Sequence, residues 1–504
     1  MEIRQKHYIA KHRSVVEAVF AHTHTSGLCL ADETRAVTYS EYCDEILKTV
    51  TALRSYGIER GQRVVVEASQ TISYLALQLA MNLSGVVFVP VERGCAWNKM
   101  LHIAQLSEAS ALIAGKIKEP DDSVTLIQMD ELCSRVAHAE PASVYSFPEP
   151  DDVSEILFST GTTGTEKGIV ISFANNIALA ENVINGVSMQ GDNVEMIPSP
   201  LNHSHGLRRY YANMVLGCTV VVLSSVMNVK KLFDMVEQYH VNSFDLVPTA
   251  LSVILRLSKD HFARYRDVIR YIQLGSAPIS EADMATLRRL LPDTRLYNFY
   301  GSTESGCICI YDFNTDSCKQ KCIGKPACNA HIIVVDEDRR PVQSSAECTG
   351  LLASKGPMNM LGYWKDEDAT KAVLENGFIY SNDEAYFDSD GDIILLGRKG
   401  DVINSGGNKI SPDEVEEAAK AHPSVADCGC IGVADALKGS VPKLFVQLRP
   451  GHEFEPASIK ECIASRLEPY KVPAAVVAIE TIPRSFNGKL LRRVLKEHHE
   501  KDNN

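Results

Sequence analysis

Amphipathic helical segments alternate with short runs of β-branched residues along this chain, and that alternation is the strongest constraint on its fold. Residues 40–57 combine a serine suited to a helix N-cap, a helical apolar period and a closing glycine. Residues 62–69 and 85–91 are short valine-rich runs, and residues 223–248 repeat the strand–helix–strand theme. The pattern is typical of parallel sheets covered by helices, and it predicts an α/β fold.

The length of 504 residues exceeds that of one compact core and predicts two or more domains. The composition shifts over residues 388–422, which contain a turn, a strand, a polar glycine-rich run and a helix start. Ser411 is a suitable N-cap, Pro412 suits the first helical position, and two acidic residues follow. We therefore predict a large domain over residues 1–398 and a small α+β domain over residues 399–504. The tail after Lys496 is expected to be disordered.

Composition excludes some classes of function. The net charge of −13 argues against nucleic-acid binding, which needs basic residues over a broad surface. The 14 cysteines are scattered without zinc-site spacing, as suits a reducing cytoplasm. The N-terminus has no apolar core of a signal peptide. The most apolar run, residues 214–226, is shorter than the ~20 residues of a membrane helix. We predict a buried strand there, and a cytoplasmic protein with no membrane span.

A glycine-rich segment, LFSTGTTGTEKGIVIS at residues 157–172, lies between two apolar runs. A Walker loop reads G-x-x-x-x-G-K-[ST], and this segment fails that pattern because Lys167 stands between Glu166 and Gly168. Glycines still let backbone N–H groups approach an anion, while hydroxyl groups add donors. The segment predicts a phosphate-binding loop, with a plain polar loop as the alternative. Its candidate ligands are Ser159, Thr160, Gly161, Thr162, Thr163, Gly164 and Lys167.

Four further motifs follow in order: NFYGSTESG (298–306), GLLASKGPMNMLGYW (350–364), GFIYSNDEAYFDSDGDIILLGRKGDVIN (377–404) and NGKLLRR (487–493). Together with the glycine-rich segment they resemble the motifs of the adenylate-forming superfamily, which includes acyl-CoA synthetases, luciferases and the adenylation domains of peptide synthetases. The resemblance covers nearly the whole chain. It implies a large N-terminal domain of parallel-rich sheets with a β-barrel-like subdomain, and a small, mobile α+β C-terminal domain.

The resemblance also implies a reaction in two steps. A carboxylate attacks the α-phosphate of ATP in the presence of Mg²⁺, which gives acyl-AMP and pyrophosphate. The thiol of coenzyme A then displaces AMP, and the better leaving group makes this second step feasible. A carrier-protein phosphopantetheine is the alternative acceptor. The implied partners are thus a small carboxylic acid and CoA or an acyl carrier protein, and the oligomeric state is expected to be a monomer or a homodimer.

Roles for individual residues come from the same resemblance. Thr303 would contact the α-phosphate, Glu304 would hold Mg²⁺, and Lys489 would reach the α-phosphate and the substrate carboxylate. A carboxylate oxygen such as that of Glu304 suits a hard cation. Asp383 would accept the ribose hydroxyls, with support from Arg398. The adenine pocket would be formed by Gly275, Ser276, Ala277, Pro278, Asn298, Tyr300 and Gly301.

The acyl site is expected around PLNHSHGL, residues 200–207. The resemblance points to His203 as an aromatic gate beside the substrate carboxylate, and a metal pair of His203 with His205 is the alternative. The segment that follows, RRYYANM, is a poor lining for a long alkyl chain. Arg208 or Arg209 is expected either to bind a second carboxylate of the substrate or to face solvent.

The chain also departs from the family pattern. Glu166 replaces a proline, Asn202 replaces an aromatic residue, and Gly400 stands at the expected hinge between the domains. Glycine can absorb the backbone rotation of a hinge. For the thiol substrate, Gly406 and Gly407 are expected to let pantetheine pass, and Lys471 to meet a CoA phosphate.

Two other classes of protein remain as alternatives at this point. A P-loop kinase or NTPase is disfavoured by the broken Walker pattern. A non-catalytic protein of the same fold would be expected to lack catalytic residues, whereas Thr303, Glu304, Asp383, Arg398 and Lys489 are all present.

Overall fold

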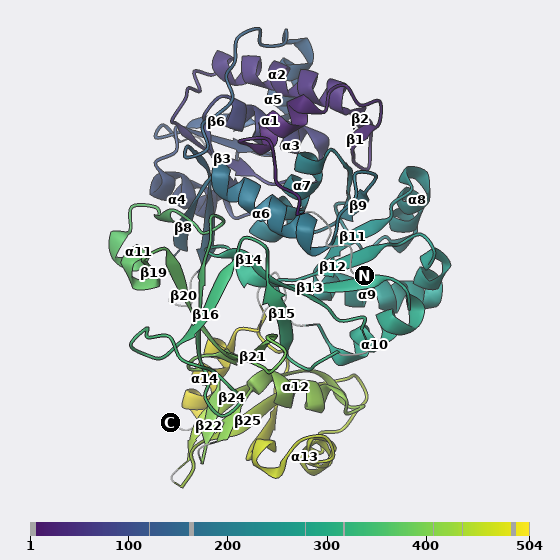
Figure 1. Cartoon of the computed structure of the whole chain (residues 1–504), viewed down its shortest axis with the longest axis vertical. Coiled ribbons are helices and arrows are strands. Elements are labelled where there is room, and N and C mark those ends of the chain that lie inside the picture. The colour runs from purple at the N-terminus through teal and green to yellow at the C-terminus, as the bar shows by residue number, and fades with distance from the viewer. Residues whose placement is uncertain are drawn as a thin grey trace.

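In the described part of the chain, three β-sheets form the framework (Figure 1). The computed structural model describes residues 7–119, 121–160, 166–277, 279–315, 318–406, 408–435, 437–484 and 490–502. In the first sheet the strand order is β16-β17-β20-β21-β15-β14-β13-β12-β11-β9-β10-β1-β2, with β19 paired to β20. Its strands are β1 (Leu28–Ala31), β2 (Ala36–Thr38), β9 (Val194–Ile197), β10 (Thr219–Val222), β11 (Ser243–Leu246), β12 (Tyr271–Leu274), β13 (Arg295–Ser302), β14 (Gly306–Asp312), β15 (Cys322–Pro326), β16 (His331–Val335), β17 (Gly350–Lys355), β19 (Leu374–Glu375), β20 (Phe378–Phe387) and β21 (Ile393–Arg398).

The first sheet has a parallel part and an antiparallel part. Strands β1, β10, β9, β11, β12 and β13 pair in parallel. From β14 onward the pairing is antiparallel through β15, β21, β20, β17 and β16. The expected α/β class is confirmed. The antiparallel part stands where the resemblance implies a β-barrel-like subdomain, and its described strands follow an open order from β14 to β16.

The other two sheets are smaller. The second has the order β18-β8-β7-β4-β3-β5-β6, and the third has the order β23-β22-β25-β24 with β26 paired to β25. The strands of the second are β3 (Arg63–Glu67), β4 (Val87–Val91), β5 (Ala111–Ala114), β6 (Thr125–Gln128), β7 (Val153–Thr160), β8 (Glu166–Ser172) and β18 (Gly362–Tyr363). Those of the third are β22 (Ile403–Ser405), β23 (Asn408–Ile410), β24 (Val425–Asp435), β25 (Gly439–Leu448) and β26 (Ala475–Ala478).

Helices cover the sheets and fill the space between the first two (Figure 1). They are α1 (Val15–Ala21), α2 (Tyr39–Ser55), α3 (Ile72–Leu83), α4 (Trp97–Ser107), α5 (Met129–His138), α6 (Phe173–Gly186), α7 (Ser204–Leu216), α8 (Val229–Tyr239), α9 (Pro248–Ser258), α10 (Glu281–Leu290), α11 (Glu367–Val373), α12 (Pro412–Lys420), α13 (Pro456–Ala464) and α14 (Arg492–Asp502), with 3₁₀ turns η1 (Lys259–Tyr265) and η2 (Pro469–Lys471). The largest apolar core joins β3 and β4 of the second sheet, β10 of the first, and α3, α6 and α7. Helix α7 is therefore buried between two sheets, which matters for the site.

Several local predictions can be compared with the structure. Helix α12 begins as predicted, with Ser411 as N-cap and Pro412 in the first turn. Helix α2 begins earlier than predicted, because Thr38 and Glu41 form a capping box that makes Thr38, not Ser40, the N-cap. The buried strand predicted over residues 214–226 is confirmed only for β10, since α7 continues to Leu216.

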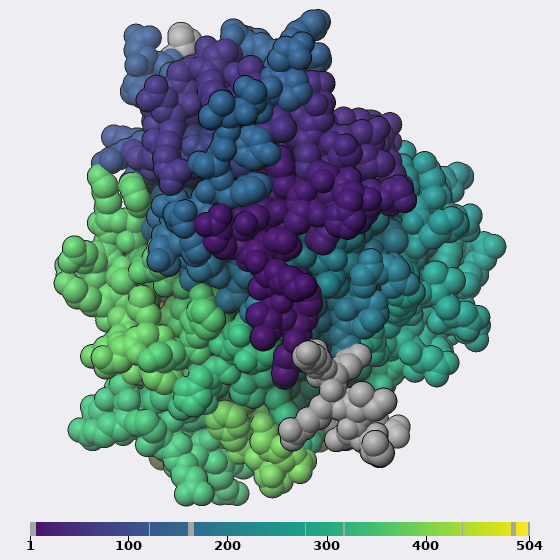
Figure 2. All heavy atoms as spheres, turned by 45° about the horizontal axis from the view of Figure 1, so that its top comes forward, coloured from purple at the N-terminus to yellow at the C-terminus, as the bar shows by residue number. Residues whose placement is uncertain are grey.

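The C-terminal tail is more ordered than predicted. Helix α14 continues to Asp502, so the expectation of disorder after Lys496 was wrong over the described part of that tail. Its Leu495 is fully buried and packs with Ile431 and Phe445 of the third sheet, and this packing stabilises the helix. At the other end of the chain, the N-terminal arm lies on the surface (purple in Figure 2), where Tyr8 and Ala10 bond to Asn185 and Glu181 of α6.

Two global features follow from the described residues. All fourteen cysteines are free thiols, and eight of them are buried. No described helix combines the length and the apolar character needed to cross a membrane.

Candidate active site

The predicted phosphate loop is flanked by strands β7 and β8, which form a β-hairpin. Strands β7 and β8 pair antiparallel, with Ser159 opposite Lys167. The connection at residues 161–165, which includes Gly161, Thr162, Thr163 and Gly164, lies outside the described residues, as does the side chain of Thr160. Because Lys167 follows the turn on a strand and does not open a helix, the hairpin differs from a Walker loop in structure as well as in sequence.

Tyr363 links this hairpin to the motif around Glu304. Strand β18 pairs with β8, and the Nζ atom of Lys167 lies 4.9 Å from the centre of the Tyr363 ring. Tyr363 Oη donates a hydrogen bond of 2.9 Å to Glu304 Oε1, and Met360 N–H donates to the Glu304 carbonyl oxygen at 2.8 Å. Burial, and then the Glu304 charge, raise the pKa of Tyr363, so it remains a donor. No described residue bonds Glu304 Oε2, and a half-buried carboxylate with one free oxygen fits Mg²⁺.

Glycines shape the turn that carries Thr303 and Glu304. A Cβ atom at Gly301 would lie 1.8 Å from the Gly306 carbonyl oxygen, so no other residue fits there. Gly306 itself has a φ of +71°. The Thr303 hydroxyl lies 3.2 Å from the hydroxyl of Ser204, in the first turn of α7. The turn is thus held against α7 on one side and against residues 360–363 on the other.

The residues expected to bind the nucleoside come together at β13, β20 and β21. Tyr300 Oη donates a hydrogen bond of 2.5 Å to Asp383 Oδ2. Arg398 lies opposite Asp383 in the β20–β21 register, with its Nε atom 3.5 Å from Asp383 Oδ1. A carboxylate fixed between a phenol and a guanidinium is well placed to accept ribose hydroxyls.

The remaining adenine-pocket residues lie at the ends of neighbouring parallel strands. Asn298 of β13 is in register with Leu274, the last residue of β12, so it lies beside Gly275. A Cβ atom at Gly275 would lie 2.8 Å from the His205 ring, and Ser276 has a φ of +71°. Ala277 continues this tight turn, and Pro278 lies outside the described residues.

His203 is the N-cap residue of α7. Burial, with smaller effects of His205 and Lys99, lowers the pKa of His203 to about 4, so its imidazole is neutral near pH 7. His205 does not face His203 as a metal partner, because its Nε2 atom lies 2.8 Å from Asp245 Oδ1. Burial opposes ionisation of Asp245, but His205 and Arg209 outweigh it and lower the Asp245 pKa. The contact of His205 with Asp245 favours the gate role of His203 over a metal pair of the two histidines.

Carboxylates with metal-ligand spacing occur once among the described residues, away from these histidines. Asp388, Asp390 and Asp392 converge on one point of the β20–β21 turn. The Nζ atom of Lys319 fills that point, at 2.6 to 2.7 Å from each of the three carboxylates. An internal cation therefore already occupies the point where the three carboxylates converge and offsets part of their charge.

The unusual Glu166 has its own partners. Its carboxylate lies 3.2 Å from Lys99 Nζ and 3.9 Å from His102 Nε2, both on α4. Lys99 is about half exposed, whereas Glu166 is largely buried. The negative charge that Glu166 adds to the β7–β8 hairpin, called the phosphate hairpin below, is thus compensated by Lys99 of the neighbouring helix α4.

Arg208 and Arg209 are both buried, with 8% and 2% of their surfaces exposed, so the solvent-facing alternative was wrong. Arg209 pairs with Asp245 at 3.3 Å and stacks on Phe299, its guanidinium carbon 3.7 Å from the ring centre. Arg208 donates to the carbonyl oxygens of Ser302 and Thr303, at 3.1 Å each.

In the small domain the structure describes some of the predicted residues and not others. Gly400 has a φ of +87°, and Gly406 has a φ of +57° with its N–H bonded to the Lys438 carbonyl. Gly407 and Lys489 lie outside the described residues. Lys471 is buried, and its ammonium lies 2.8 Å from both Glu414 and Glu468, so a CoA phosphate there would compete with two carboxylates.

Ion pairs join the small domain to the large one. Lys321, just before β15, lies 2.8 Å from Glu414 of α12. Lys409 of β23 bonds the carboxylate of Glu384, the neighbour of Asp383. The third sheet is thereby tethered close to the strand that carries the expected ribose ligand.

Sequence reasoning missed three residues of the site: Lys99, Ser204 and Tyr363. Tyr363 stood inside a recognised motif, in the pair Gly-Tyr, which was the available signal. Nothing in the sequence around Lys99 or Ser204 marked them, since their roles arise from helix packing against distant strands.

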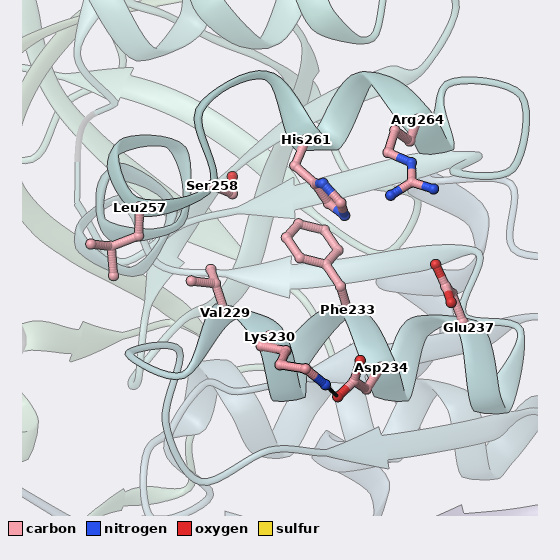
Figure 3. Close-up of a pocket in the computed structure, with 9 residues that line it drawn as sticks. All are labelled: Val229, Lys230, Phe233, Asp234, Glu237, Leu257, Ser258, His261 and Arg264. Carbon is pink, nitrogen blue, oxygen red and sulfur yellow. Dashed lines mark hydrogen bonds and ion pairs between the residues drawn. The ribbon is translucent and has the colours of Figure 1, made fainter.

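A separate cavity of about 520 Å³ lies between α8 and η1 (Figure 3). His261 points toward the Phe233 ring there, with 4.4 Å between ring centres, and Lys230 pairs with Asp234. None of the predicted site residues lines it, so it is not part of the candidate active site.

Comparison with known proteins identifies the class. The family model described as AMP-binding enzyme matches residues 16–364, and the model described as AMP-binding enzyme C-terminal domain matches residues 414–489. The first match spans more than half of the chain. The protein therefore belongs to the family of AMP-binding enzymes, which confirms the resemblance to adenylate-forming enzymes.

Among curated relatives, a 2-succinylbenzoate–CoA ligase of Bacillus cereus is 27% identical over 472 residues, covering 92% of this chain and 94% of that protein. A 4-coumarate–CoA ligase-like 3 protein of Oryza sativa subsp. japonica is 31% identical over 365 residues, covering 69% of this chain and 60% of that protein.

Solved structures agree on the fold. MatB from Rhodopseudomonas palustris bound to ATP has a TM-score of 0.85 at 21% identity, covering 97% of this chain and 99% of MatB. The o-succinylbenzoate coenzyme A synthetase MenE from Bacillus subtilis, in complex with ATP and magnesium ion, has a TM-score of 0.84 at 25% identity, covering 95% of this chain and 99% of MenE.

Proposed function

We propose that this protein is an ATP-dependent carboxylic acid:CoA ligase that proceeds through an acyl-AMP intermediate. The observation that carries the proposal is the assembly of Lys167, Tyr363 and Glu304 beside the pair of Tyr300 with Asp383. The first set suits polyphosphate and a cation, and the second suits a ribose. Relatives named as CoA ligases support the joining of an acid to CoA as the overall reaction.

In the first step, a carboxylate oxygen of the acid attacks the α-phosphorus of ATP, and the bond to the bridging oxygen of the β-phosphate breaks. Acyl-AMP and pyrophosphate result. Negative charge grows on the α-phosphate, and preorganised donors must meet it. We assign Thr303 to donate its hydroxyl there, and Lys167 to attract the leaving pyrophosphate. Lys489 would neutralise the α-phosphate and the attacking carboxylate.

Glu304 would hold Mg²⁺, which supplies positive charge to the phosphate oxygens when bound. Tyr363 keeps the carboxylate of Glu304 in place by its hydrogen bond. The neutral His203 would wall the acyl site without adding a charge to it.

In the second step, the thiolate of CoA attacks the acyl carbon, and the bond from that carbon to the AMP oxygen breaks. We place the hinge between residues 1–398 and 399–504 at Lys399 and Gly400, about which the small domain would turn between the steps. Gly406 and Gly407 would line the thiol path. We place the reaction in the cytoplasm, where fourteen free thiols would stay reduced.

The alternative acceptor is the phosphopantetheine of a carrier protein, which presents the same thiol. Curated relatives named as CoA ligases favour free CoA. A comparison of thioester formation on free CoA with that on a carrier protein separates the two acceptors.

The test is carboxylate-dependent exchange of pyrophosphate into ATP, over a panel of small, aromatic, dicarboxylic and fatty acids, followed by thioester formation with CoA. Exchange with at least one acid is expected, and Lys489→Ala should abolish it. A P-loop kinase would show no such exchange. Failure of every acid to support exchange, with ATP bound normally, would refute the proposal.

A further inference from the structure

Arg208 occupies an unusual position in the buried helix α7. It lies one helical turn after Ser204, so both side chains project toward the turn at Thr303. Its guanidinium donates to the carbonyl oxygens of Ser302 and Thr303, and 8% of the residue is exposed. Burial lowers the pKa of Arg208 to about 10, which still leaves it charged near pH 7. A cation is thus held next to the expected site of the reacting carboxylate.

This cation has no carboxylate partner among the described residues. Within the described part of the chain Arg208 forms no ion pair, whereas its neighbour Arg209 pairs with Asp245. Charged side chains are seldom buried without a partner, because desolvation is costly. The guanidinium has five N–H donors in a planar fork, and the two bonds to carbonyl oxygens leave the others available.

Two carboxylates, those of Glu155 and Glu304, act on Arg208 at longer range. Glu155 accepts a hydrogen bond of 2.5 Å from Tyr211, and burial raises the pKa of Glu155 to about 7, so it is only partly ionised near that pH. Glu304 accepts from Tyr363. Neither carboxylate forms an ion pair with Arg208 in the described part of the chain.

We propose that Arg208 binds a second anionic group on the acid substrate, so that the preferred substrate is a dicarboxylate or a carboxylate with another acidic group. This inference rests on the proposed function, and it names the class of acid. The second anion would form a charge-assisted, two-pronged hydrogen bond with the guanidinium. The reacting carboxylate would then lie near Thr303 and His203, at the N-terminal end of α7.

The alternative is that Arg208 only positions the turn at Ser302 and Thr303. That role would affect all acids alike, because the turn serves ATP and every acid in the same way. The two roles therefore differ in their dependence on the charge of the substrate.

The first experiment uses the unaltered enzyme and a matched pair of substrates, a dicarboxylic acid and its half-amide, in the exchange assay. The half-amide has the same size but lacks the second charge. With chain length varied, kcat/KM for the best diacid should exceed that for its half-amide about tenfold to a hundredfold. Equal values across all chain lengths would overturn the inference.

The second experiment uses Arg208→Met, which keeps most of the stem, and Arg208→Lys, which keeps the charge. We expect Arg208→Met to lower the ratio of kcat/KM for the diacid to kcat/KM for the half-amide about tenfold or more, and any loss common to both substrates measures the bonds from Arg208 to the turn. Arg208→Lys should retain part of the preference. An equal loss for both substrates would assign Arg208 the positioning role alone.

The results also separate this inference from the proposed function. Good exchange with monocarboxylates and no preference for diacids would leave the ligase function standing and overturn the role of Arg208. Exchange with no acid of any class would overturn both.

Discussion

Tyr363 Oη donates a 2.9 Å hydrogen bond to Glu304 Oε1, and this contact joins two motifs separated by about sixty residues of chain. Tyr363 belongs to the strand beside the phosphate hairpin, whereas Glu304 follows the strand that carries Asn298 and Tyr300. The expected cation ligand is therefore oriented by the segment that also contacts Lys167. If Lys167 and Glu304 bind phosphate and Mg²⁺ as proposed, Tyr363 contacts both sites.

The first prediction concerns Tyr363→Phe. Loss of a hydrogen bond to a carboxylate costs about 1.5–3 kcal/mol, so adenylation should slow about tenfold and need more Mg²⁺ for half-maximal rate. Tyr380→Phe is the matched control, since the Tyr380 ring stacks under Arg339 and its hydroxyl has no hydrogen-bond partner in the described structure. An unchanged dependence of the exchange rate on Mg²⁺ in Tyr363→Phe would contradict this role of Tyr363.

The second prediction concerns the pair of Lys99 with Glu166. Lys99→Met leaves the Glu166 carboxylate uncompensated beside the phosphate hairpin, so KM for ATP should rise roughly two- to fivefold. Glu166→Gln should change KM for ATP less, and the double variant should restore a value near that of the unaltered enzyme. Additive effects in the double variant, measured by exchange kinetics, would show that the two side chains do not act as a pair.

The third prediction is that Gly400→Pro impairs thioester formation more than adenylation. Gly400 has a φ of +87°, whereas proline holds φ near −65°, so the variant cannot adopt the observed backbone or rotate freely about it. Gly391→Pro is the control, because Gly391 also has a positive φ, +76°, but joins two strands of one sheet. The two half-reactions would be measured separately, and equal losses in Gly400→Pro would argue against a hinge at this residue.

The fourth prediction concerns the pH dependence of stability. Burial, and then Asp245, raise the pKa of Glu195 to about 8 from 4.5. Between pH 4.5 and about 8, the carboxyl of Glu195 is protonated in the folded chain and ionised in the unfolded chain. The contribution of Glu195 to the free energy of unfolding is therefore full below pH 4.5 and is lost as the pH rises to about 8. In Glu195→Gln that loss is absent. Its Tm should therefore fall less than that of the unaltered protein between about pH 5.5 and about pH 8.

The control for this measurement is Glu367→Gln, in which an exposed side chain of α11 is changed. It should show the pH dependence of the unaltered protein. If Glu195→Gln also kept that dependence, the ionisation of a different group would have to explain it.

Much of the fold and of the site was accessible from sequence because the decisive signals are local. The order of helices and strands follows from apolar periodicity, and the start of α12 follows from Ser411 and Pro412. Gly301 and Gly306 mark a turn that excludes side chains. Asp383 and Arg398 belong to one recognisable motif, and the β20–β21 register places them opposite each other.

Local patterns misled where longer-range packing dominates. Residues 497–502 are polar enough to suggest disorder, yet Leu495 anchors α14 in the core of the small domain. Arg208 and Arg209 have the composition of a solvated helix face, yet α7 lies between two sheets and both side chains are buried.

The residue types and spacing along the chain thus establish the family, the order of the elements and the identity of most candidate ligands. The tertiary structure alone decides which of them meet: Tyr363 with Glu304, Lys99 with Glu166, and Arg208 with the turn at Thr303. The physical reason is that the two residues of each contact lie some 60 to 100 positions apart in the sequence and belong to separate segments of the fold. Their encounter depends on strand order and helix burial, which minimise exposed apolar surface over the whole domain.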